Sequence, residues 1–245
     1  MSIYNEGGFD VEFKSDNSPL TRADKAAHRI IKEELEKTGI PILSEEGKHL
    51  SYEERKDWEK LWIVDPIDGT KEFIKKSGEF TINIALIEQQ KPVLGVVYAP
   101  ALKVIYWGSK SGSYKLANVT CFDDFQSSFK NKQKLPLKSD TKNFTIAASK
   151  SHLTEKTKNF IEKQRREYPN VEVISKGSSL KICMVAEGVL DCYPRFGTTM
   201  EWDTAAGHAV CSYAHAEIQD WNQIPLLYNK KDLRNSDFIC VSAHS

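Results

Sequence analysis

The most informative segment of this chain is Leu61-Trp62-Ile63-Val64-Asp65-Pro66-Ile67-Asp68-Gly69-Thr70. Its first four residues are large, apolar and mostly β-branched or aromatic, which indicates a buried strand. Asp65 and Asp68 follow that strand three residues apart, and a turn at a strand end can aim both carboxylates at one point. Hard divalent cations such as Mg2+ bind several carboxylate oxygens. The segment therefore predicts a cation site, with a plain turn that caps a helix as the alternative.

The residues beside these two acids add further groups that can hold a ligand. The carbonyl of Ile67 lies between the acids, and Gly69 lets the backbone come close to a ligand. If a helix begins here, the amides of residues 69–71 are donors for a phosphate. A cation site and a phosphate site are therefore predicted at the same strand end.

Other acids follow or precede structured segments elsewhere in the chain. Glu45-Glu46 follows a short apolar run, and Glu201-Trp202-Asp203 precedes a predicted helix of small residues. Each of these acids alone is typical of a helix cap or a solvated surface. Placed together with the two acids of the strand, they would supply the four or five carboxylates of a multi-magnesium phosphatase.

Outward from the central segment, the first half of the chain has the pattern of a helix followed by a sheet. Residues 21–39 repeat apolar side chains at helical spacing, with a capping-box pair at Thr21 and Asp24. Alternating or continuous apolar residues predict strands at 80–86, 93–98, 104–107 and 113–116. The polar, lysine-rich residues 118–141 are the predicted junction between two lobes.

Beyond this junction, predicted strands alternate with predicted helices. The strands are at 144–148, 171–174 and 190–193, and the helices are at 154–167, 178–187 and 204–213. Such alternation is typical of an α/β arrangement. The sequence therefore predicts an α+β lobe over residues 1–136 and an α/β lobe over residues 137–245.

The composition excludes several classes of function. Lys plus Arg and Asp plus Glu both number 34, so the net charge is zero, and binding to a nucleic acid polymer is not expected. No apolar run approaches the roughly 20 residues of a transmembrane helix, and residues 1–10 lack the features of a secretory signal. Five scattered cysteines without a CxxC pair predict free thiols in a reducing compartment, and hence a cytoplasmic protein.

Two longer motifs carry a resemblance to a known family. Residues 62–74, Trp-Ile-Val-Asp-Pro-Ile-Asp-Gly-Thr-Lys-Glu-Phe-Ile, resemble the first signature of the inositol monophosphatase superfamily of lithium-sensitive, magnesium-dependent phosphomonoesterases. Residues 201–208, Glu-Trp-Asp-Thr-Ala-Ala-Gly-His, resemble its second signature. Four further segments are similar to the branch of CysQ-type 3'(2'),5'-bisphosphate nucleotidases: residues 16–24, 78–85, 177–181 and 193–196.

The resemblance implies a layered α/β/α/β/α sandwich with the active site between the lobes. It implies that Glu45, Asp65 and the carbonyl of Ile67 hold one Mg2+. Asp65, Asp68 and Asp203 would hold a second, so most metal ligands belong to the first lobe. A third, weaker Mg2+ near Glu45 is left open, as is peripheral association with the inner membrane in bacteria.

The resemblance also assigns catalytic roles to Asp24, Thr70, Asp65 and Glu45. Thr70, paired with Asp24, would orient the attacking water, because a hydroxyl between a carboxylate and a water aligns that water. A metal would lower the pKa of the same water. No covalent phosphoenzyme is needed.

Substrate choice is assigned mainly to the second lobe. Ser178 lies in a Gly-Ser-Ser segment predicted to open a helix, and Lys181 and Arg195 add cationic donors for phosphate. The implied substrate contacts are Gly69, Thr70, His152, Ser178, Lys181, Arg195 and Asp203. The implied substrate is 3'-phosphoadenosine 5'-phosphate, cleaved to AMP and phosphate, with 3'-phosphoadenylyl sulfate as a further candidate. A helix cap, surface charges and a loop histidine are the structural alternatives for the second-lobe residues.

Two other functions stay open at this point. The first is an inositol or sugar monophosphatase on the same core, in which Lys181 and Arg195 would be idle. The second is a non-catalytic relative that only binds a nucleotide. The presence of Thr70 and of all the proposed catalytic acids argues against it.

The chain departs from the family pattern at two places. Members usually begin with a helix ahead of the segment that matches residues 3–5, so we expect exposed apolar surface where that helix packs. A glycine pair near a turn usually follows the second signature, and residues 211–217 contain none. If that turn needs a positive φ, we expect Ala214 or His215 to adopt it with strain.

Overall fold

The strand predicted at residues 61–64 lies inside a seven-stranded sheet. The computed structural model describes residues 1–13, 19–137, 143–149 and 154–243. The sheet has the order β3 (Ile42–Ser44), β4 (Lys60–Asp68), β5 (Thr81–Glu88), β6 (Lys91–Ala99), β7 (Val104–Ser109), β8 (Gly112–Ala117) and β9 (Gln133–Lys134). β3 pairs with β4 in parallel, and each later pair of neighbours is antiparallel, as predicted for the first lobe.

A bulge in β4 explains how two acids three residues apart serve one site. On a regular strand, side chains three positions apart point to opposite faces. Here Asp65 pairs with Asn83 and Asp68 pairs with Thr81, so three steps along β4 match two steps along β5. The one extra residue restores both carboxylates to the same face. The two acids therefore belong to the strand itself, and their predicted place in a turn after the strand is wrong.

The predicted junction also has structure of its own. It contains α5 (Phe122–Ser128), a 3-10 helix (Phe129–Asn131) and β9, which pairs with β8. Phe125 and Phe129 pack their rings against Trp107 of β7. This aromatic contact fixes part of the polar stretch to the first sheet, and the division into two lobes at this junction stays a prediction.

The second sheet is mixed rather than purely parallel. Its order is β11 (Val171–Lys176), β10 (Phe144–Ser149), β12 (Cys192–Arg195), β14 (Phe238–Val241) and β13 (Glu217–Asp220). β10 runs parallel to β11 and β12, whereas β14 is antiparallel to both of its neighbours. The sequence did not predict β13 and β14, and it placed β12 two residues too early.

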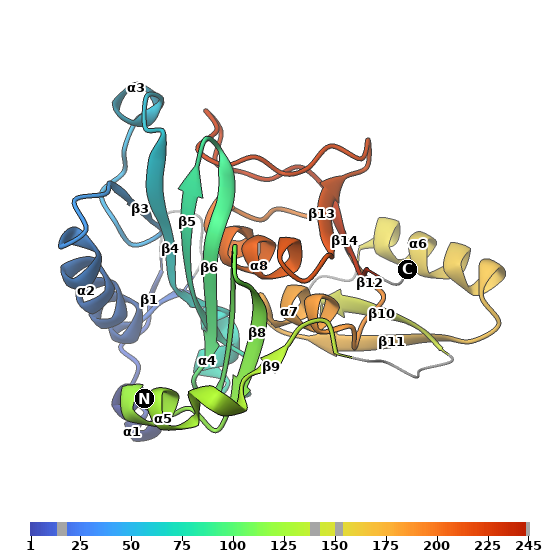
Figure 1. Cartoon of the computed structure of the whole chain (residues 1–245), viewed down its shortest axis with the longest axis horizontal. Helices are drawn as coiled ribbons and strands as arrows, with labels where there is room; N and C mark the ends of the chain where they lie inside the picture. The colour runs from blue at the N-terminus through green and yellow to red at the C-terminus, as the bar shows by residue number, and fades with distance from the viewer. Residues whose placement is uncertain (14–18, 138–142, 150–153, 244–245) are drawn as a thin grey trace.

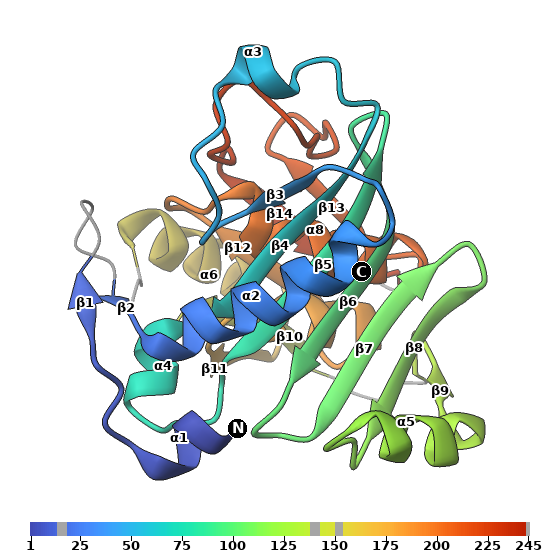
Figure 2. The same ribbon diagram turned by 90° about the vertical axis from the view of Figure 1, so that its left-hand side faces the viewer.

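Helices separate and cover the two sheets (Figure 1). α2 (Arg22–Glu36) covers one face of the first sheet, as Figure 2 shows, and α6 (Glu155–Glu167) packs on the second sheet. α7 (Leu180–Glu187) and α8 (Glu201–Ser212) lie between the sheets. This confirms the expected five-layer sandwich. Among the described residues, no helix is long and apolar enough to cross a membrane.

Small residues let α8 lie directly on the first sheet. A Cβ at Gly95 of β6 would be only 2.3 Å from the carbonyl oxygen of Ala206, and a Cβ at Gly108 of β7 would be 2.6 Å from that of Ala209. These distances leave no room for a side chain at either glycine. The close approach fixes the height of α8 above the sheet, and with it the position of Asp203 in the first turn.

The turn after α8 contains a residue with a positive φ, as expected for a turn in which the family's glycine pair is absent. His215 has a φ of 62°, a left-handed conformation that non-glycine residues seldom adopt. It follows the final turn of α8, where its amide donates to the carbonyl of Ser212. The expected positive φ is therefore confirmed at His215.

The remaining short elements lie around the first sheet. They are α1 (Ser2–Glu6), β1 (Glu12–Phe13), β2 (Pro19–Leu20), α3 (Tyr52–Arg55) and α4 (Thr70–Ile74). Tyr4 of α1 packs its ring against Phe73 of α4 and Phe80. The expectation of exposed apolar surface beside this segment stays a prediction.

Candidate active site

Three acids from separate parts of the chain meet between the sheets. Asp65 and Asp68 come from the bulged strand β4, and Asp203 comes from the first turn of α8. One carboxylate oxygen of each lies within 4.8 Å of the others. The structure thus brings together three of the four predicted carboxylate ligands in the spacing that suits a bound cation.

Backbone amides hold each of these carboxylates in place. The amide of Ile67 donates to Asp65 Oδ1 at 3.0 Å, and the amide of Ser179 donates to Asp68 Oδ2 at 2.5 Å. The amide of Met200 donates to Asp203 Oδ2 at 2.8 Å, which caps α8. The helix-cap and ligand interpretations of Asp203 are therefore compatible, since one oxygen caps and the other remains for the site.

Burial and mutual repulsion raise the pKa values of the cluster. Burial is the main cause for Asp65, whose pKa lies well above its usual range, and the charges of Glu45, Asp68 and Asp203 add to it. Burial and the charge of Asp68 raise the pKa of Asp203 to about 8. Buried carboxylates in such proximity cannot all ionise without a counter-charge. A divalent cation supplies that charge, so the residues present fit a metal.

Glu45, the fourth predicted ligand, lies next to this cluster. Its amide donates to the carbonyl of Val64 at 3.1 Å, which places it beside Asp65 across the β3–β4 pair. Its negative charge contributes to the raised pKa values of Asp65 and Asp203. The end of β3 and the bulge of β4 therefore position adjacent acids.

The predicted pair of Thr70 and Asp24 is also formed. Thr70 Oγ1 lies 3.3 Å from Asp24 Oδ1 and 3.2 Å from the carbonyl oxygen of Ile67, and it can donate to either. The other Asp24 oxygen accepts the amide of Thr21 at 2.8 Å, so the same carboxylate closes the capping box of α2. Only 2% of Asp24 is exposed, and its direction is therefore fixed.

Gly69 is required between the strand and α4. Its φ is 88°, and a Cβ there would lie 3.2 Å from the carbonyl oxygen of Glu79 and 3.4 Å from the Cβ of Ser178. A side chain would both strain the backbone and press on the opposite wall. The glycine thus allows the chain to turn from Asp68 to Thr70 within one residue.

In the segment before α7, backbone amides that were predicted to bind a phosphate donate to protein side chains instead. The helix begins at Leu180 rather than Ser178, and Ser178 has a φ of 49°. The amide of Gly177 donates to Glu79 Oε2 at 3.0 Å, and that of Ser179 donates to Asp68. Two of the amides expected for a phosphate are therefore bound to protein carboxylates.

Lys181 and Arg195 lie on the same pocket as the acids. Lys181 Nζ donates to the carbonyls of Ser178 at 2.7 Å and Lys176 at 3.2 Å, and burial lowers its pKa to about 8. The charge of Arg195 also lowers the pKa of Lys181, which indicates that the two cations are close. Arg195 Nη2 donates to the carbonyl of Thr198, and Arg195 Nε is buried with no partner in the described part of the chain.

These groups line a pocket of about 170 Å³. Asp68, Gly69 and Asp203 form part of its wall, and Ser178, Lys181 and Arg195 form another part. Four further residues line the pocket without a predicted role: Lys176, Tyr193, Thr199 and Phe238. No local sequence pattern indicates that they lie close to the acids. Lys71 and Glu72, which belong to the first signature, also line the pocket. His152 lies outside the described residues.

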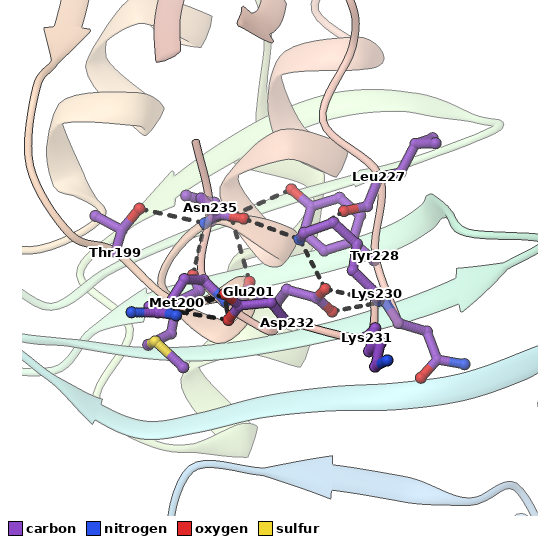
Figure 3. Close-up of polar contacts among 12 residues, drawn as sticks. Thr199, Met200, Glu201, Leu227, Tyr228, Lys230, Lys231, Asp232 and Asn235 are labelled. Carbon is purple, nitrogen blue, oxygen red and sulfur yellow. Dashed lines mark hydrogen bonds and ion pairs between the residues drawn. The ribbon is translucent and has the colours of Figure 1, made fainter. Parts of the chain in front are cut away.

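Glu201 is not part of the acid cluster, although the sequence grouped it with the other acids. Its side chain is fully buried, and its two oxygens accept the amides of Asn229 at 2.6 Å and Lys230 at 2.9 Å (Figure 3). Lys230 Nζ forms an ion pair with it at 2.7 Å. Glu201 therefore faces away from the cation site and holds a neighbouring segment.

A five-layer sandwich with a buried acidic cluster and a cationic wall between its sheets defines the sugar-phosphatase class of folds. The chain belongs to the inositol monophosphatase family, whose sequence model matches residues 2–244. It is 44% identical over 242 residues to the 3'(2'),5'-bisphosphate nucleotidase CysQ of Shigella flexneri. That alignment covers 95% of this chain and 89% of the relative. CysQ of Escherichia coli K12 is 42% identical over the same share of each chain.

Solved structures agree with this assignment. CysQ from Bacteroides thetaiotaomicron has a TM-score of 0.90 and 47% identity, over 100% of this chain and 92% of that one. The IMPase of Thermotoga maritima has a TM-score of 0.73 at 24% identity, over 97% and 84% of the two chains. The second likeness concerns the fold alone.

Proposed function

We propose that this chain is a Mg2+-dependent 3'(2'),5'-bisphosphate nucleotidase that hydrolyses 3'-phosphoadenosine 5'-phosphate to AMP and phosphate. We propose 3'-phosphoadenylyl sulfate as a second substrate. The observation that carries the proposal is a pocket lined by Asp68 and Asp203 of the acid cluster and by two cations, the buried Lys181 and the half-buried Arg195. The names of its CysQ relatives point the same way.

The acid cluster is the proposed place of two Mg2+ ions. Glu45, Asp65 and the Ile67 carbonyl would hold one, and Asp65, Asp68 and Asp203 would hold the other. Bound Mg2+ lowers the pKa of a coordinated water and neutralises charge on a transferred phosphoryl group. The Ile67 carbonyl still has a second lone pair beside the one that faces Thr70 Oγ1.

Thr70 is the proposed partner of the attacking water. When Thr70 donates its hydrogen to Asp24 or to the Ile67 carbonyl, its oxygen lone pairs can accept a hydrogen from water. The attacking water gives up one proton as its oxygen forms the new bond to phosphorus. The bond from phosphorus to the 3' oxygen breaks, and the leaving oxygen takes up one proton from solvent, so that the protons balance. Asp24 orients Thr70, and its own position is fixed by the capping box of α2.

Lys181 and Arg195 are the proposed contacts for the phosphate that is not cleaved. Two positive charges side by side in a buried pocket repel each other, and an anion between them removes that cost. Arg195 Nε has no partner in the described structure, which leaves a donor for such an anion. A substrate with one phosphate would leave this wall unused.

The five cysteines support a cytoplasmic location for the enzyme. All of them are free thiols, and only Cys121 is exposed. The sulfurs of Cys211 and Cys240 lie 3.5 Å apart without a disulfide. Neighbouring thiols stay reduced in a reducing compartment.

The test is phosphate release with Mg2+ from 3'-phosphoadenosine 5'-phosphate, inositol 1-phosphate and AMP. The variant Asp65→Asn is the matched blank, because it removes a charge shared by both proposed metals while keeping the shape of the side chain. We expect a strong preference for the bisphosphate and a loss of at least about 1,000-fold in the variant, as for removal of a group essential to catalysis. Preference for inositol phosphate would reject the second-phosphate pocket. Activity of Asp65→Asn near wild type would reject the metal assignment.

A further inference from the structure

A buried network ties the start of α8 to a distant segment, here called the strap and defined as residues 227–235. Glu201 accepts two strap amides and the Lys230 ammonium with a side chain that is 0% exposed (Figure 3). In return, the amide of Glu201 donates to the carbonyl of Leu233 at 2.9 Å. Asn235 Nδ2 donates to the carbonyl of Met200 at 2.8 Å. The strap thus holds Met200 and Glu201, the residues at which α8 begins.

The strap is joined in turn to the first lobe through a reciprocal pair of hydrogen bonds. Arg55 Nη1 donates to Asn229 Oδ1 at 2.8 Å, and Asn229 Nδ2 donates to the carbonyl of Arg55 at 2.8 Å. Arg55 Nη2 also donates to the carbonyl of Lys231 at 3.2 Å. Arg55 ends α3, ten residues after Glu45 and ten residues before Asp65.

The burial of Arg55 costs free energy that a purely structural contact would not require. It is 2% exposed, it has no carboxylate partner among the described residues, and its Nε has no hydrogen-bond partner there. Its charge is met only by neutral oxygens and by the ring of Tyr52, whose centroid is 5.3 Å from Arg55 Cζ. Burying a charge without an opposite charge costs free energy, and apolar packing would hold two segments together without that cost. Directional hydrogen bonds instead fix one relative position of the segments.

We propose that Glu201, Asn229 and Arg55 are positioning residues that set the affinity of the acid cluster for its cation. The network links the two parts of the chain that supply the ligands: the β3–α3–β4 segment with Glu45 and Asp65, and the first turn of α8 with Asp203. Groups behind a ligand commonly change metal affinity in this way. The inference rests on the proposed cation site and assigns it a set of supporting residues outside the pocket.

The test measures Mn2+ binding to the folded protein through loss of the free-ion electron paramagnetic resonance signal. Glu201→Gln places an amide NH2 among three donors, and we expect it to weaken Mn2+ binding by about 10- to 100-fold. Asn229→Gly keeps the backbone amide that reaches Glu201, and its φ of 62° suits glycine, so this variant should fold. It removes only the two side-chain hydrogen bonds between Asn229 and Arg55, while the bond from Arg55 to the Lys231 carbonyl remains. We therefore expect a smaller loss of affinity. Phosphate release at saturating Mg2+ should keep its KM for the bisphosphate in both variants.

Asp232→Asn is the matched control. Asp232 lies on the same strap and is exposed, and in the described structure its side chain pairs only with Arg234 and the Arg234 amide. Mn2+ affinity should be unchanged in this variant. Unchanged affinity in folded Asn229→Gly, and in Glu201→Gln if it folds, would overturn the inference while leaving the cation site intact. Failure of the wild-type protein to bind Mn2+ would instead overturn the proposed function, and this inference with it.

Discussion

At the scale of single residues, several side chains both stabilise a helix and form part of the candidate site. Asp24 caps α2 with one oxygen and faces Thr70 with the other. Asp203 caps α8 and contributes to the acid cluster. A capping carboxylate is held by backbone amides, so its second oxygen has a fixed direction. Structural and functional interpretations of these acids are therefore not alternatives, and each cap pre-positions a group of the site.

The charge of Lys181 can be tested separately from its bulk. Lys181→Met keeps most of the side-chain volume and removes the ammonium group. We expect kcat/KM for 3'-phosphoadenosine 5'-phosphate to fall by about 10- to 100-fold, the value of one charged hydrogen bond, with a much smaller effect on a monophosphate. Because the pKa of Lys181 is about 8, the wild-type advantage should also decline as pH rises above 8, where the amine loses its proton.

The exposed Lys110→Met is the control for this comparison, since Lys110 lies in the turn between β7 and β8 away from the pocket. Equal losses on both substrates would contradict the role in specificity. Lys181 would then act through Asp68, whose pKa its charge lowers.

At the scale of elements, the sequence predicted most of the longer helices and strands, but it missed β13 and β14 and gave no detailed geometry. The acids of β4 were identified, yet the bulge that brings them to one face depends on pairing with β5, which is 13 or more residues away. The role of Glu201 was missed for the same reason: its partners Asn229 and Lys230 are 28 and 29 residues away. β14 pairs with β12 across more than 40 residues, and no local pattern marks such a contact. Local spacing and the family motifs therefore predicted the candidate ligands, whereas long-range pairing decides which acids meet.

The contact between α8 and the first sheet gives a prediction at the same scale. Gly95→Ala would place a Cβ 2.3 Å from the carbonyl oxygen of Ala206, so α8 or β6 must move. We expect a loss of about 1–3 kcal/mol in the free energy of unfolding, as for other overpacked cores, measured by urea denaturation. Since α8 carries Asp203, Mg2+ affinity should fall together with stability. Unchanged stability would show that the two layers can separate without cost.

At the scale of the whole molecule, the acid cluster lies where the layers meet, so its charge affects the stability of the fold. The pKa of Asp203 is about 8 in the folded protein and 3.8 when unperturbed, and that of Asp65 is raised as well. Between these values the folded state binds more protons than the unfolded state, so the free energy of unfolding falls as pH rises. The partly buried His28 and the buried His208 have lowered pKa values and oppose this trend only below 6.5. Lys181 opposes it only above about 8.

Between pH 6.5 and 8, the titration of the buried carboxylates therefore dominates the pH dependence of stability. Thermal unfolding in this pH range tests the cation site without any substrate. In the presence of a chelator, we expect Tm to fall as pH rises from 6.5 to 8. Added Mg2+ should raise Tm, and by more at pH 8, because only ionised carboxylates bind the metal and only the folded state gathers them. Asp203→Asn should show a shallower fall in Tm and a smaller response to Mg2+. Two results would contradict this prediction: a Tm that rises across this window in the presence of chelator, or a Mg2+-induced shift in Tm that does not grow with pH. Either result would mean that the three acids are not the coupled cation ligands inferred from their geometry.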